Sequence, residues 1–101
     1  MSKLVRNRIT EIIRKDGKTP EWTMLKDDDE IHDALVEKMG EERREYAESG
    51  AKEEIVDMFE VLRSIAHHQN MSVEEIICWA AKKREERGGF SSGLVLHGVE
   101  E

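Results

Sequence analysis

The clearest hydrophobic pattern lies in the middle of the chain, where apolar residues recur every three or four positions. Asp27 and the acidic residues behind it precede this pattern, where they would cap a helix and place negative charge at its positive end. Ser49 and Gly50 interrupt the pattern. The sequence therefore predicts two long helices, over about residues 28–48 and 51–69, joined by a tight turn.

Shorter patterns lie on either side of this pair. Residues 7–15 alternate apolar and basic side chains and predict a short amphipathic helix. Ser72 and Glu75 have the spacing of a capping box, so a third main helix is expected to begin there and to run to about Arg87. The rest is expected to be irregular or briefly extended, including residues 94–96. The fold class predicted is all-α, a helical bundle completed by oligomerisation.

The first long helix places acids among its apolar residues. With Ile31 set at 0° and about 100° per residue, Leu35 lies near 40°, Glu42 near 20° and Glu45 near 320°. The two glutamates thus fall within the stripe that an amphipathic helix turns toward its core. We expect Glu42 and Glu45 to face the interior and not the solvent.

The second long helix shows two strips of residues. The apolar stripe, which we expect to be buried, consists of Ile55, Met58, Phe59, Leu62, Ile65 and Ala66. A mixed flank strip, spaced three or four residues apart, consists of Glu54, Asp57, Val61, Ser64 and His68. Such a flank is typical of a helix whose edge lines a cavity.

Two carboxylate pairs, Glu42/Glu45 and Glu54/Asp57, lie at matching distances on either side of the turn. An antiparallel hairpin would bring Glu45 level with Glu54 and Glu42 level with Asp57. Acids held that close repel one another unless protons or cations lie among them. An all-oxygen ligand set suits a hard cation such as Mg²⁺. The alternatives are a buried basic partner, or a solvated acidic face paired with the arginines nearby.

Composition narrows the class of protein. The 101 residues are enough for one domain. With 38% hydrophobic and 39% charged residues, the core is limited, and association with a second copy is expected. The net charge of −7 argues against nucleic-acid binding. A single cysteine, Cys78, and the lack of a long apolar run favour a cytoplasmic protein without disulfides or membrane spans.

The acidic segments resemble a known family. KMGEERREY at 38–46, followed by EEIVDMFEVL at 53–62, is similar to the E-x-x-E…E-x-x-D pattern of MazG-like, all-α nucleoside triphosphate pyrophosphohydrolases. KLVRNRITEII at 3–13 and KKREERGGF at 82–90 resemble a small subfamily that is phosphoribosyl-ATP pyrophosphohydrolase-like. The resemblance implies one MazG-like helical domain over residues 1–101, assembled as a homodimer or homotetramer.

The resemblance also implies roles for particular residues. The acids that would hold Mg²⁺ are Glu42, Glu45, Glu54 and Asp57. The residues that would contact phosphates are Lys83 and Arg87, with Arg6 and Arg8 as weaker candidates. The general base that accepts a proton from water would be Glu41 or Glu45.

The activity implied is hydrolysis of a nucleoside triphosphate between its α- and β-phosphates, which releases a nucleoside monophosphate and pyrophosphate. Two other hypotheses stay open at this point. The same scaffold could act on phosphoribosyl-ATP in histidine biosynthesis. Alternatively, the protein could be a non-catalytic helical interaction module.

Overall fold

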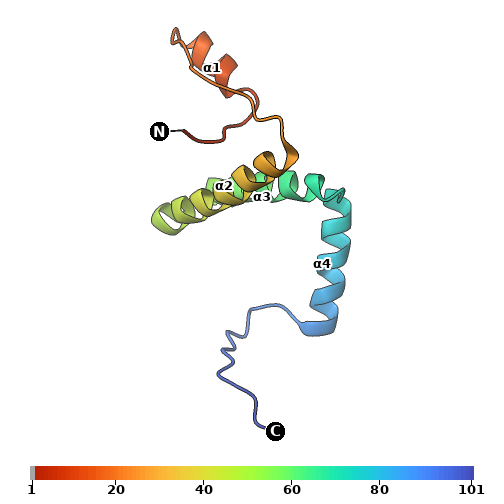
Figure 1. Ribbon diagram of the computed structural model, residues 1–101. Helices are drawn as coiled ribbons and strands as arrows, with labels where there is room; N and C mark the ends of the chain where they lie inside the picture. Colours follow the sequence, from red (N-terminus) through yellow and green to blue (C-terminus); the bar gives the residue numbers. More distant parts are fainter. Residues whose placement is uncertain (1) are drawn as a thin grey trace. The chain divides into compact units, whose positions relative to one another are not determined.

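The computed structural model describes residues 2–101, which form α-helices and no strand (Figure 1). The helices in chain order are α1 (Ile9–Lys15), α2 (Asp28–Ser49), α3 (Lys52–His68) and α4 (Val73–Arg87). The predicted all-α class is therefore confirmed for the described residues, with helix ends within two residues of the prediction. The segments expected to be irregular or briefly extended, including residues 94–96, have no regular structure.

The described chain divides into two compact units, one ending at Asn70 and one running from Met71 to Glu101. The first unit contains α1, α2 and α3, and the second contains α4 and the C-terminal tail. Each unit is described separately below. The expectation of one domain over the whole chain stays a prediction.

The first unit is built on an antiparallel hairpin of α2 and α3, which lie side by side (Figure 1). The Asp27 side chain caps α2 as predicted, because its Oδ1 accepts hydrogen bonds from the amides of Asp29 at 2.8 Å and Glu30 at 3.3 Å. At the other end, Gly50 adopts a left-handed conformation with φ of 63°, and its amide donates to the Tyr46 carbonyl at 2.8 Å. A residue without a Cβ reverses the chain there at little cost.

The interior of this unit is small. Its buried apolar residues are Leu35 from α2 and Val61 and Ala66 from α3. Glu42 is buried among them, as the helical wheel of α2 predicted. Amphipathic helices owe most of their stability to tertiary packing. A core of so few apolar residues therefore gives a hairpin of two long helices little stabilisation.

The prediction for α3 was wrong in one respect. Ile55, Phe59 and Leu62, expected to be buried, are 51%, 47% and 43% exposed. The flank strip, which contains Asp57 and Val61, is instead the covered side of the helix. The reason is geometric: α2 and the N-terminal segment pack against the flank strip, and nothing within residues 2–70 buries these three residues. Ala66, the last residue of the apolar stripe, is buried as expected.

The second unit begins with a capping box at the start of α4, as predicted. The Ser72 hydroxyl accepts from the Glu75 amide at 3.1 Å, and the Ser72 amide donates to the Glu75 carboxylate at 3.3 Å. The helix ends at Gly88, where φ is 83°. None of the residues of α4 is buried. Among residues 2–101, none of the helices has both the length and the apolar composition needed to cross a membrane.

Candidate metal centre

Carboxylates from α2 and α3 gather along the first unit's hairpin. Oxygen atoms of Glu42, Glu54 and Asp57 lie within 4.8 Å of one another, and so do oxygen atoms of Glu41, Glu42 and Glu45. Glu42 belongs to both groups. The structure therefore brings together the four acids for which the sequence predicted a shared site, and it adds Glu41 to them.

Glu42 is the most enclosed of these acids. Its residue is 6% exposed, because it lies on the buried stripe of α2 beside Leu35. One carboxylate oxygen, Oε1, lies 3.3 Å from the Lys38 ammonium. The other, Oε2, is buried and has no hydrogen-bond partner. A buried carboxylate oxygen without a partner is costly, so this atom is a position where a cation would be stabilising.

Glu54, on α3, is in the same situation as Glu42 on α2. Its Oε2 atom is also buried without a hydrogen-bond partner. Burial, together with the neighbouring charges of Glu45 and Glu42, raises the pKa of the Glu54 carboxyl to about 7. The cluster therefore takes up a proton near neutral pH when no cation is present. A divalent ion would compete with that proton for the same oxygens.

Three basic side chains compensate part of this negative charge. Lys38 lies 3.1 Å from Glu41 Oε2 and 3.3 Å from Glu42 Oε1, and its side chain is only 16% exposed. Burial would lower the pKa of Lys38, but hydrogen bonds to the two glutamates outweigh it, so the pKa is raised. Arg6 donates to Asp57 at 2.7 Å, and Lys3 lies 3.8 Å from Glu41. A buried basic partner thus exists, yet it leaves one oxygen each of Glu42 and Glu54 unpaired.

A cavity of about 530 Å³ adjoins the acids within the first unit. Its walls come from the N-terminal segment Leu4–Arg8 and from the facing sides of α2 and α3. Glu42 and Asp57 contribute to the wall, so the cavity opens directly onto the acid cluster. Its basic wall residues are Arg6, Arg8, Lys38 and Arg63. Negative and positive groups therefore line one space, as a site for a metal and an anionic ligand requires.

The sequence-predicted phosphate contacts separate into two groups. Arg6 and Arg8 line the cavity, although the sequence ranked them as the weaker candidates. Lys83 and Arg87 lie four residues apart on α4 in the second unit, and both are exposed. Their contact with phosphates stays a prediction.

The sequence analysis overlooked several residues of the site. Lys38 lies four positions before Glu42, a spacing that places two side chains together on a helix, so this ion pair could have been found. Glu60 and Arg63 on α3 also line the cavity. Ser64 lines it too, in agreement with its predicted place on the flank strip.

Comparison with protein-family models, with curated proteins and with solved structures found no match for this chain. The similarity of its motifs to MazG-like proteins therefore remains a resemblance.

Proposed function

We propose that this protein is a Mg²⁺-dependent nucleoside triphosphate pyrophosphohydrolase that cleaves between the α- and β-phosphates. The observation that carries the proposal is the environment of the Glu42 carboxylate. The residue is 6% exposed, one of its oxygens has no partner, and oxygens of Glu54 and Asp57 lie within 4.8 Å. Glu42 also lines a cavity whose wall contains basic side chains. A solvated acidic face would not bury this oxygen. The motif resemblance supplies the class of reaction.

The residues that would hold Mg²⁺ are Glu42, Glu45, Glu54 and Asp57. The donor set fits the ion, because all of its atoms are carboxylate oxygens and two of those oxygens are buried without partners. When bound, Mg²⁺ would neutralise charge on the phosphates and lower the pKa of a bound water.

The remaining steps fall to side chains of the chain itself. Glu41 or Glu45 would accept the proton of the attacking water. Glu41 is oriented by Lys38 at 3.1 Å, whereas Glu45 makes no ion pair within residues 2–101. The two candidate bases therefore have distinct surroundings: Glu41 is paired with Lys38, whereas Glu45 lies against the Glu54 carboxyl.

Basic residues would bind and orient the phosphates. Arg6 and Arg8 line the cavity beside Asp57, where they can neutralise the charge that develops on the leaving pyrophosphate. Lys38 lines the same cavity and remains protonated. Lys83 and Arg87 are proposed to add to this binding, as the resemblance implies.

We also propose that the protein is a homo-oligomer. The support is the exposed apolar stripe of α3, where Ile55, Phe59 and Leu62 are all more than 40% exposed and Val56 beside them is 63% exposed. Contiguous apolar surface of this kind marks protein interaction sites. A second copy offers the same face and can bury it symmetrically, as in most soluble oligomers.

Pyrophosphate release tests the proposed activity. Canonical and modified nucleoside triphosphates, with phosphoribosyl-ATP as one further substrate, would be offered with Mg²⁺ and with EDTA. We expect Mg²⁺-dependent release from at least one nucleoside triphosphate. The Glu42→Gln variant should lose it, whereas Glu37→Gln, which alters an exposed acid on the same helix, should keep it. If the protein released pyrophosphate from phosphoribosyl-ATP alone, we would assign it that reaction. If it released pyrophosphate from none of the compounds, the result would favour an interaction module.

A further inference from the structure

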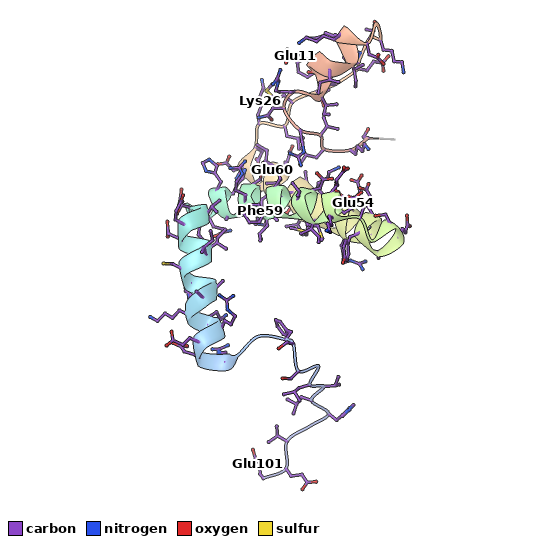
Figure 2. The ribbon with its side chains drawn as sticks, turned by 180° about the vertical axis from the view of Figure 1, so that it is seen from behind. Glu11, Lys26, Glu54, Phe59, Glu60 and Glu101 are labelled. Carbon is purple, nitrogen blue, oxygen red and sulfur yellow. The ribbon has the colours of Figure 1, made fainter. Side chains whose placement is uncertain are left out.

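One acid of the cavity has no part in the proposed metal site. Glu60 follows Asp57 by three residues on α3, about 4.5 Å further along the helix axis. Figure 2 labels Glu60 on α3. The residue lines the same cavity, and its side chain is 35% exposed, so a ligand can reach it. A carboxylate so near a phosphate-binding region requires its own explanation, because it repels phosphate.

Glu60 is held firmly by its neighbours. Arg63 binds it with both ends of its guanidinium group, Nε at 2.9 Å from Oε1 and NH2 at 2.6 Å from Oε2. The Ser64 hydroxyl donates to the Glu60 carbonyl at 2.9 Å and lies 3.4 Å from Oε2. Such a two-point contact fixes both the position and the direction of a carboxylate.

The charge state of Glu60 defines what it can bind. Its hydrogen bond with Arg63 lowers the pKa of the Glu60 carboxyl, so the group is ionised at neutral pH. An ionised carboxylate only accepts hydrogen bonds, and each of its oxygens has two lone pairs. Arg63 uses one lone pair on each oxygen, and Ser64 approaches Oε2. Oε1 therefore keeps an open position for a donor from the ligand.

The parts of a nucleotide that donate hydrogen bonds are its sugar hydroxyls and the N–H groups of its base. The sugar directly follows the α-phosphate, so it would occupy the part of the cavity one turn beyond Asp57. Past Glu60 the wall contains Val61 and Leu35, whose apolar side chains suit the flat face of a base. Polar residues line the same part of the cavity: Arg63, Ser64, His67 and His68. A nucleotide with its phosphates at the acid cluster and its sugar one turn further along α3 would have its sugar next to Glu60.

We propose that Glu60 accepts a hydrogen bond from the sugar 2′-hydroxyl of the bound nucleotide, and that the site thereby selects ribonucleotides over 2′-deoxyribonucleotides. This inference rests on the proposed function, since it assumes a nucleotide with its phosphates at the acid cluster. It adds a substrate class that neither the acid motif nor the metal site defines.

The experiment compares kcat/KM for pyrophosphate release from matched ribo- and 2′-deoxyribonucleoside triphosphates of each base. A hydrogen bond to a charged group corresponds to a preference of about 10- to 100-fold. We expect the wild type to favour the ribonucleotide by about that factor. Glu60→Gln should reduce the preference to within about 3-fold by slowing only the ribonucleotides. The matched control Glu37→Gln should leave both rates unchanged.

Several results would overturn the inference. Equal rates for ribo- and deoxyribonucleotides in the wild type would overturn it. This outcome needs no variant, so it would count even if Glu60→Gln failed to fold. An equal loss for both sugars in Glu60→Gln would show that the residue only supports the helix. A change in the ranking of bases, with the sugar ratio unchanged, would assign Glu60 to the base. No release from any nucleotide would remove the proposed function as well, which separates the two failures.

Discussion

On α3, Asp57, Val61 and Ser64 lie covered or half-covered beside the cavity, whereas Ile55, Phe59 and Leu62 on another side of the same helix face solvent. The flank strip is more enclosed than Ile55, Phe59 and Leu62 of the apolar stripe, the reverse of the arrangement expected for an isolated soluble helix. The comparison shows that residues 2–70 form the cavity but leave this part of the apolar stripe uncovered. A second copy would cover this surface in the proposed homo-oligomer.

The enclosed side of α3 is best tested at Asp57. Asp57→Asn keeps the size of the side chain but removes the charge of a proposed metal ligand from the cluster. Loss of a group that only orients a metal ligand lowers activity roughly 10- to 100-fold. We expect Mg²⁺-dependent pyrophosphate release to fall by more than that factor. The helical circular dichroism spectrum should remain that of the wild type. Full activity in this variant would remove Asp57 from the metal site.

The open side of α3 is tested at Phe59, which is 47% exposed. Phe59→Glu places a charge in the apolar strip and should weaken self-association about 10- to 100-fold, the factor expected when burial of one large apolar side chain is lost. Light scattering after size-exclusion chromatography measures the effect. Glu53→Lys, an exposed position about 120° around the same helix from Phe59, serves as the control. A wild type that is monomeric at all concentrations would contradict the oligomer.

The junction between the N-terminal segment and α3 is tested at Arg6. Its 2.7 Å ion pair with Asp57 is partly exposed, so its contribution to folding stability is small. Its contribution to phosphate binding should be larger, and Arg6→Gln should raise KM for the nucleotide about 10-fold with a smaller change in kcat. Arg14→Gln, on α1 and away from the cavity walls, should change neither constant. An unaltered KM in Arg6→Gln would place the phosphates elsewhere.

The smallest expected effect concerns the pH dependence of stability. Because the pKa of Glu54 is raised from 4.5 to about 7, the folded state retains a proton in this window that the unfolded state releases. The metal-free protein should therefore lose stability as the pH rises from about 4.5 to 7, and change little from this group above that range. Thermal unfolding of the metal-free protein at pH 5 and pH 8 measures the difference.

A matched pair of variants isolates this contribution. Glu54→Gln should lessen the fall in melting temperature between pH 5 and pH 8, whereas Glu48→Gln, an exposed acid near the end of α2, should not. Added Mg²⁺ should stabilise the wild type most at the higher pH, where the proton no longer competes. The same slope in Glu54→Gln as in the wild type would show that this carboxyl is not the titrating group.

Much of this architecture could be predicted from local sequence. Asp27, Gly50 and Ser72 mark helix ends through contacts made within a few residues, so caps and periodicity located α2, α3 and α4. The burial of Glu42 followed from its angular position among the apolar residues of α2. These features depend only on the regular geometry of a helix, so they can be read from the spacing of residues in the sequence.

The remainder depends on contacts between distant segments. Arg6 and Asp57 are 51 residues apart, and their ion pair follows from the path of the N-terminal segment, which no periodicity encodes. The exposure of the Phe59 strip was mispredicted because hydrophobicity identifies a face that will be buried but does not identify the surface that buries it. The cavity role of Glu60 likewise required three segments to meet.

The measurement that tests the account most directly is calorimetric titration of metal-free protein with Mg²⁺ at pH 8, where little proton competition from Glu54 is expected. We predict saturable binding to the wild type and to Glu37→Gln, and its loss in Glu42→Gln. Saturable binding of equal strength in Glu42→Gln, or no binding to the wild type, would contradict the assignment of the buried acid cluster as a metal centre.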